Sequence, residues 1–241
     1  MAEMNEIPKP SGPVWQGQLD LGDRWALWRG DIGDGVLHRH FAAQAIVSDS
    51  PVRVFDEHGR YVEAECVLID PLTPHRVVPG QKAKLIYIEP GKRMGPDAVE
   101  LLRPVRSAKS LAIVSSTEGL RFWSIWLSTP APLLESIDAR LSATLEFIEG
   151  ALAYGPVPLQ IAASQAQLSP DRFRHLFADQ MGLTFRRYVL WRRLRLASTY
   201  LMDGQDVTTA AHAAGFSDAA HFARTIKSTF GVTATQALVG R

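Results

Sequence analysis

The sequence has little of several features that mark particular classes of protein. It contains a single cysteine, Cys66, so no internal disulfide can form and a reducing compartment such as the cytoplasm is expected. Nowhere do about eighteen apolar residues run together, so we expect no transmembrane helix and no membrane partner. The first residues lack the basic start and apolar run of a secretory signal, and we expect none.

The sequence also lacks a marked excess of positive or negative charge, because its net charge is only +1 over 241 residues. Residues 1–139 hold 15 Lys and Arg against 18 Asp and Glu, whereas residues 140–241 hold 11 against 7. The C-terminal part is therefore mildly basic, which fits nucleic-acid binding but does not establish it. A content of 46% hydrophobic and 21% charged residues is typical of a globular chain.

Short strands are predicted in the first part of the chain. Residues 61–69 alternate in polarity and place Ala64, Cys66 and Leu68 on one face. Residues 56–59 separate this run from residues 52–55, as a hairpin loop would. Several strands at this spacing predict a small antiparallel sandwich or barrel.

The period changes to that of a helix after Pro132. Apolar residues at spacings of four, three and four predict an amphipathic helix over residues 137–153, and no strand pattern follows it. We therefore predict an α+β protein of two domains. Its parts are a mobile arm (1–12), a β domain (13–94), a connector that could serve dimerisation (95–136) and an all-α domain (137–241).

The all-α domain contains the same unit twice, 48 or 49 residues apart. Each copy has two alanines, an apolar residue followed by serine, three apolar residues at i, i+4 and i+8, and a glycine. The first copy is Ala162, Ala163, Leu168, Ser169, Phe173, Phe177, Met181 and Gly182, and the second is Ala210, Ala211, Phe216, Ser217, Phe222, Ile226, Phe230 and Gly231.

This pattern predicts two helix-turn-helix units, at about residues 159–182 and 207–231. Small alanines let two helices approach closely, and the apolar stripe buries one side of the second helix. Ser169 and Ser217 are good helix N-caps, and each final glycine can take the left-handed conformation that ends a helix.

Burial of the stripes would leave the opposite helix faces exposed. These faces hold Asp171, Arg172, Arg174 and His175 in the first unit, and Ala219, Ala220, His221, Arg224 and Lys227 in the second. Arginine is the commonest reader of guanine in the major groove, and alanine can contact a thymine methyl group. The alternative is an ordinary solvated face, which the repetition of the whole unit makes less credible.

One continuous helix is predicted between the units, over residues 184–201. About eighteen residues span roughly 27 Å, against roughly 34 Å for one turn of DNA. The helix could thus set two recognition helices into successive segments of the major groove. We expect phosphate contacts from Arg186 and Arg192 of this helix, and from Ser169 and Ser217.

The C-terminal part resembles the DNA-binding domain of the AraC/XylS family of bacterial transcription regulators. The most specific similarity lies in residues 193–197, 207–211, 215–216, 221–224 and 230–233. The resemblance covers about residues 137–238 and implies a seven-helix domain that binds promoter DNA. By position, the base-reading places of the family fall on Asp171, Arg174 and His175, and on Ala219, Ala220 and Arg224.

The β domain is similar to the cupin-type barrel that many members of this family use for sensing. The similarity rests on His38, His40 and Gln44, followed by His75. Three imidazoles would suit zinc, iron or nickel, but metal cupins usually add a carboxylate where this chain has Gln44. We therefore predict a small-molecule pocket at these four residues and no cofactor, with a divalent metal at the three histidines as the weaker alternative.

The leading hypothesis is a cytoplasmic, bacterial, sequence-specific regulator without enzymatic activity, controlled by a small-molecule effector in the barrel. We also expect a homodimer, and contact with RNA polymerase is compatible with this role. A metal-dependent cupin enzyme with an appended helical domain is the alternative from another class. A third hypothesis is a constitutive DNA-binding protein whose barrel only dimerises.

Overall fold

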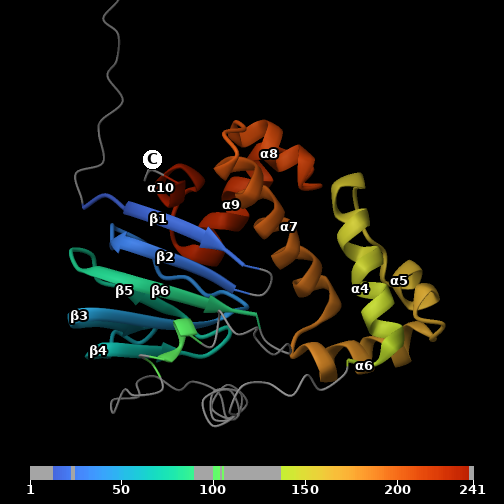
Figure 1. The fold of residues 1–241 in the computed structure, drawn as a ribbon, viewed down its shortest axis with the longest axis horizontal. Coiled ribbons are helices and arrows are strands. Elements are labelled where there is room, and N and C mark those ends of the chain that lie inside the picture. Colours follow the sequence, from blue (N-terminus) through green and yellow to red (C-terminus); the bar gives the residue numbers. More distant parts are fainter. Residues whose placement is uncertain (1–12, 23–24, 90–99, 104, 106–136, 239–241) are drawn as a thin grey trace, which may run out of the picture.

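The computed structural model describes residues 13–22, 25–89, 100–103, 105 and 137–238. The predicted arm (1–12) and most of the predicted connector (95–136) lie outside the described residues. Within them, a β-sheet domain is followed by a helical domain (Figure 1), so the predicted two-domain α+β fold is confirmed.

The β domain is one antiparallel sheet of six strands. The strands are β1 (Gln16–Leu21), β2 (Trp25–Asp31), β3 (Ala43–Asp56), β4 (Tyr61–Ile69), β5 (His75–Val77) and β6 (Lys82–Ile88). They are ordered β1-β2-β6-β3-β4, and β5 also pairs with the long strand β3. The loop between β3 and β4 lies where the hairpin was predicted, and β4 coincides with the alternating run.

Both faces of this sheet are buried. One face carries Trp28, Ile46 and Leu85 and packs with Val232 of the helical domain. The other face carries Leu27 and Ile86 and packs with residues 102 and 105. Burial on both faces explains why β4 is almost continuously buried at its end.

The prediction that Ala64, Cys66 and Leu68 share one face was wrong in part. Ala64 packs with the cluster that faces the helices, whereas Cys66 and Leu68 belong to the other cluster. The pairing of β3 with β4 is irregular between Val47 and Val52, and this irregularity changes the phase of the alternation.

The helical domain contains seven α-helices in the described residues. They are α4 (Ala139–Ala151), α5 (Leu159–Gln165), α6 (Pro170–Met181), α7 (Phe185–Met202), α8 (Val207–Ala213), α9 (Ala219–Phe230) and α10 (Ala234–Leu238), with a 3₁₀ turn at Leu152–Tyr154. Helices α5 and α6 form the first helix-turn-helix unit, α8 and α9 form the second, and α7 joins them.

Local sequence explains where the second helix of each unit begins and ends. Ser169 caps α6 by accepting a hydrogen bond from the Arg172 N–H, as predicted. The cap of α9 is Asp218, which accepts from the His221 N–H, so Ser217 lies one residue too early. Both helices end at the predicted glycines, with φ of 68° at Gly182 and 73° at Gly231.

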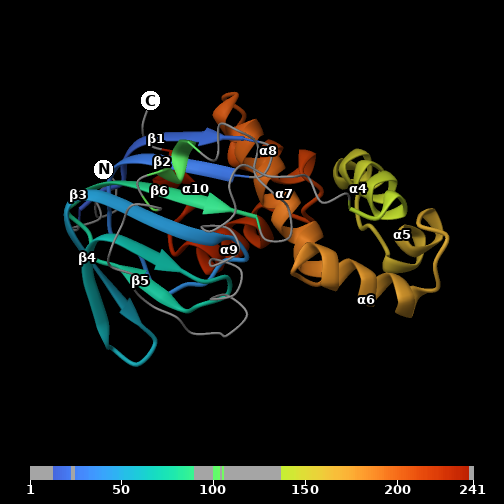
Figure 2. The same cartoon turned by 60° about the horizontal axis from the view of Figure 1, so that its bottom comes forward.

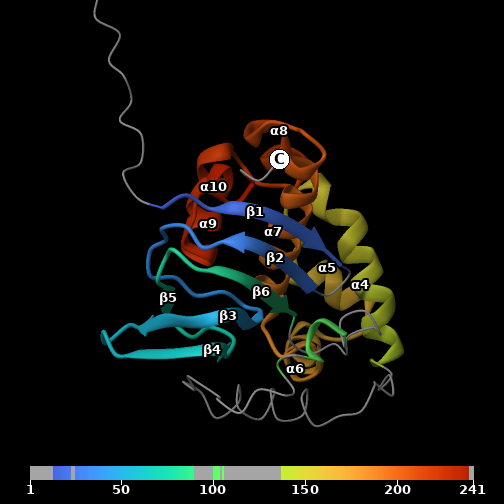
Figure 3. The same ribbon diagram turned by 60° about the vertical axis from the view of Figure 1, so that its left-hand side comes forward.

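The two units differ in their position relative to the sheet. The first has its own core with α4 and the start of α7, and it stands beyond α7, away from the strands (Figure 2). The second lies against the sheet near β1 and β2 (Figures 1 and 3). None of the described helices is long and apolar enough to cross a membrane.

Candidate nucleic-acid interface and histidine cluster

The predicted reading face of the first unit is exposed on α6. Asp171, Arg172, Arg174 and His175 all point to solvent, whereas Phe173 and Phe177 are buried, as the apolar stripe required. Arg174 forms an ion pair with Asp171 at 2.8 Å. Both side chains are more than half exposed, so the ion pair is weak. Arg174 can therefore leave Asp171 to contact another group.

The predicted face of the second unit is exposed on α9. Ala220, His221, Arg224 and Lys227 are exposed, and Ala219 is partly so. Ser217 is exposed at the start of the helix, where its hydroxyl donates to Asp218 at 3.0 Å. The two faces therefore present four cationic groups that carry a fixed charge: Arg172, Arg174, Arg224 and Lys227.

Arg192 differs from the prediction of an exposed phosphate contact. Its side chain is 11% exposed and forms ion pairs with Glu89 at 3.2 Å and with Glu149 at 2.7 Å. Burial by itself would lower the pKa of Arg192, but the nearby carboxylates of Glu89 and Glu149 outweigh this effect. The net result is a pKa above the ordinary value for arginine, so the side chain stays charged. Arg186, by contrast, is exposed, and so is Ser169, whose hydroxyl oxygen also caps α6.

Glu89, at the end of β6, joins the two domains. Its buried carboxylate accepts a hydrogen bond from the indole N–H of Trp191 and pairs with both Arg192 and Arg195. Arg195 also donates to the carbonyl oxygens of Gly22 and Trp25. Sequence reasoning missed Glu89, because nothing local links it to arginines more than a hundred residues away.

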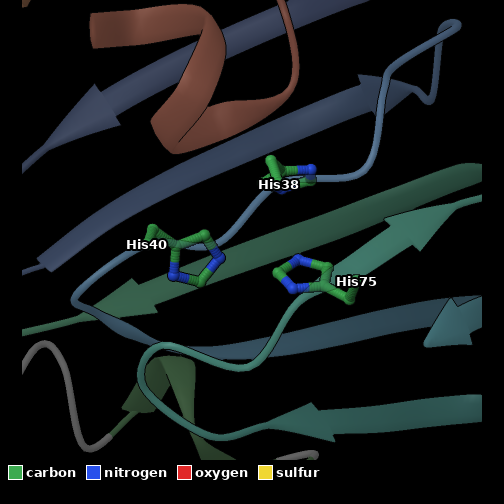
Figure 4. A group of neighbouring side chains, drawn as sticks. All are labelled: His38, His40 and His75. Carbon is green, nitrogen blue, oxygen red and sulfur yellow. The ribbon is translucent and has the colours of Figure 1, made fainter. Parts of the chain in front are cut away.

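The three predicted histidines are brought together beside the sheet (Figure 4). His75 begins β5, and its backbone pairs with that of His38 through hydrogen bonds of 2.9 and 3.0 Å. Ring centroids lie 4.3 Å apart for His38 and His75, and 5.1 Å apart for His40 and His75. One nitrogen from each ring lies within 4.8 Å of the others.

Hydrogen bonds fix the tautomer of each ring. Nδ1 of His38, His40 and His75 lies 2.7–2.9 Å from the carbonyl oxygens of Val36, Ala42 and Thr73, respectively. A carbonyl only accepts, so each Nδ1 carries the proton and each Nε2 keeps a lone pair when the ring is neutral. Burial lowers the pKa of all three histidines, to about 4 for His38, and keeps them neutral.

Gln44 completes this cluster. It is buried, and its Oε1 lies 3.0 Å from Nε2 of His40. Because His40 donates through Nδ1, two acceptors face each other here, which requires either a rotated amide or a cation between them. The buried Nε2 of His75 has no hydrogen-bond partner among the described residues.

The C-terminal end of α9 covers the cluster. The Val36 N–H donates to the Gly231 carbonyl at 3.0 Å. A Cβ at Gly231 would lie 2.5 Å from Nδ1 of His38, so only glycine fits there. The Phe230 ring next to it packs on Tyr87 and lies 6.3 Å from the His40 ring. The sequence showed Gly231 only as a helix end, without this contact.

An apolar pocket lies where the sheet meets α7 and α9. Its empty space, with the adjoining open solvent included, is about 680 Å³. Its walls come from both domains, and they include Trp15, Leu19, Trp28, Leu194, Ile226 and Phe230. Arg195 and Ser198 are the polar groups on the helical side. The predicted ligand residues do not line this pocket, although Phe230 and Tyr87 separate it from the histidine cluster.

Known proteins resemble the helical half most clearly. A model of a helix-turn-helix domain matches residues 162–238. The transcriptional activator RhrA of Rhizobium meliloti is 31% identical over 101 residues, which are 41% of this chain and 32% of RhrA. Over its helical half the chain is therefore similar to a transcriptional activator that contains a helix-turn-helix domain.

A second relative is the bifunctional transcriptional activator and DNA repair enzyme Ada of Escherichia coli. It is 37% identical over 82 residues, which are 34% of this chain and 23% of Ada. The chain spans about a third or less of the length of these two curated relatives.

Solved structures extend the likeness to both domains. ToxT from Vibrio cholerae O395 has a TM-score of 0.56 at 11% identity, over 91% of this chain and 100% of ToxT. A ToxT structure from strain SCE256 with a bound unsaturated fatty acid has a TM-score of 0.52 at 10% identity, over 91% and 96%. At this identity the likeness shows a shared fold.

Proposed function

We propose that this protein is a sequence-specific DNA-binding transcription regulator. Its helices α6 and α9 would enter successive segments of the major groove of a promoter. The observation that carries the proposal is the repeated unit with an exposed face on each second helix. The intervening α7 has 18 residues and therefore a length of about 27 Å, close to one DNA turn. The match to transcriptional activators supports the same role.

Selection from a random pool of duplex DNA with the full chain tests this function. We expect an enriched site with two blocks about one helical turn apart. Binding of that site should weaken as salt rises, because phosphate contacts release counterions. Binding that depends on salt but enriches no sequence would contradict a sequence-specific regulator.

The effector is proposed to be an apolar small molecule that occupies the pocket between the domains. Pockets for small ligands have mostly apolar walls with a few polar groups that fix the orientation of the ligand. Because both domains line this pocket, an occupant would contact the β domain and the second helix-turn-helix unit together. A neighbour in structure, ToxT, holds an unsaturated fatty acid, so a monounsaturated fatty acid is the first probe.

Two neighbouring substitutions on α7 test this pocket. Ser198 lines it, and Ser198→Phe should fill it and abolish the thermal stabilisation given by the fatty acid. Thr199 is exposed, so Thr199→Phe adds the same ring outside the pocket and should leave that stabilisation intact. Equal stabilisation of both variants would place the ligand elsewhere.

Further partners belong to the same proposal. We infer a homodimer, which would bind a repeated promoter site more tightly than one copy, and a contact with RNA polymerase in the bacterial cytoplasm. Light scattering on the protein, free and bound to the selected site, measures the first. Transcription in vitro from a promoter with that site measures the second.

A further inference from the structure

We propose that His38, His40 and His75 bind a divalent transition metal ion whose occupancy controls the docking of the second helix-turn-helix unit on the β domain. The proposal deepens the regulatory function above and rests on it, because the docked unit is one that would read DNA. The β domain would then hold a second regulatory binding site, separate from the apolar pocket.

The donor set fits such an ion. Each imidazole has its Nδ1 proton held by a backbone carbonyl, so its Nε2 lone pair is left for a ligand. The buried Nε2 of His75 has no hydrogen-bond partner in the part of the chain that the structure describes, and Oε1 of Gln44 faces Nε2 of His40 at 3.0 Å. A cation that accepts both lone pairs resolves this contact, with Gln44 as a neutral oxygen ligand.

The size of the cluster also fits. Imidazole nitrogens bind zinc at about 2.0–2.1 Å, and one nitrogen from each ring lies within 4.8 Å of the others. The three rings must therefore draw closer together around the ion to complete the site. Three neutral imidazoles and an amide suit zinc, cobalt, nickel or iron better than calcium or magnesium, which prefer oxygen ligands.

The cluster is coupled to α9 by direct contact. His38 lies under the left-handed C-cap of α9, where Gly231 leaves no room for a side chain. The segment that carries His38 also donates a backbone hydrogen bond from Val36 to Gly231. Any ion that draws His38 towards His40 and His75 therefore fixes the surface on which Gly231 and Phe230 rest.

The experiment starts with full-length protein that has been stripped of metal with a chelator. Titration with Co²⁺ should give one bound ion and the visible absorption of a nitrogen-rich site, and zinc should displace it. His75→Ala should abolish this absorption, whereas His58→Ala, on an exposed hairpin side chain, should not change it. Failure of the wild type to bind one equivalent would overturn the proposal.

Hydrogen exchange measures the coupling. Zinc should slow exchange of the Val36 amide and of the peptide that contains Gly231, and should leave the first unit unchanged. By linkage, a change at Gly231 must also weaken the metal. Gly231→Ala should lower zinc affinity by about tenfold or more, within the range for lost outer-shell support.

Gly182→Ala is the matched control, because it places alanine at the same left-handed C-cap position in the first unit. Both variants carry the same backbone strain, so equal zinc affinities in the two would overturn the coupling. Binding to the selected DNA site is measured in parallel. Specific DNA binding without a metal site refutes this inference alone, whereas a coupled metal site without specific DNA binding refutes the proposed function.

Discussion

Glu89→Gln tests whether one buried carboxylate holds the two domains together. The substitution keeps the shape and an oxygen that can accept from Trp191, but it removes the charge that faces Arg192 and Arg195. The arginine side chains are 11% and 13% exposed, so water compensates them poorly. Breaking a buried pair costs about 3–5 kcal/mol.

The expected loss lies below that range. Arg192 keeps its pair with Glu149 at 2.7 Å, and Arg195 keeps two backbone carbonyls. We therefore expect the free energy of unfolding to fall by about 2–3 kcal/mol in urea denaturation, followed by circular dichroism and tryptophan fluorescence.

Glu63→Gln is the control, since Glu63 pairs with Arg53 at 2.8 Å where both side chains are about two-fifths exposed. Removing that pair should cost about 0–1 kcal/mol. The reasoning fails if Glu89→Gln loses no more stability than the control.

Three further outcomes are expected. Arg224→Ala should weaken the selected DNA site by about 1–3 kcal/mol and relax base preference at one position; a loss equal on all sequences in binding assays would remove α9 as a reading helix. Phe177→Ala should cost about 3–5 kcal/mol of stability in urea unfolding, because the ring is fully buried among Phe173, Phe185 and Tyr188; a loss below 1 kcal/mol would contradict the packing. Hydrogen bonds from Arg140 lower the pKa of Asp138, the cap of α4, from 3.8 to about 2. Its contribution to stability is therefore present above pH 3.8 and lost as the pH falls towards 2, so Asp138→Asn should flatten the pH dependence of urea unfolding in that window.

The two helix-turn-helix units were readable from the sequence because their determinants are local. An apolar residue every fourth position sets the buried side of α6 and α9, and a glycine at the left-handed position ends each helix. Even the error is local, since Ser217 and Asp218 are adjacent polar residues and either can cap a helix. Which side chains contact DNA stays a prediction, although the faces predicted for α6 and α9 are exposed.

The strands were predicted less fully, because their pairing joins residues far apart. Alternation located β4 but could not show the irregularity in β3 that moves Ala64 to a different face from Cys66. His38 and His40 are two residues apart and could be grouped from the sequence. His75 joined them only through the resemblance to cupins, and the pairing of β5 with β3 then placed it there.

The sequence by itself determined the class of the helical domain, the exposed faces of its second helices and the pairing of His38 with His40. Only the tertiary structure decided that Arg192 faces Glu89 and not solvent, that the apolar pocket lies between the domains, and that Gly231 closes the histidine cluster. The formation and capping of a helix depend on residues that are close in the sequence, so a local pattern can predict them. Contacts between domains depend on the shapes and charges of two folded surfaces whose residues are far apart in the sequence. The periodicity of either segment alone does not predict such contacts.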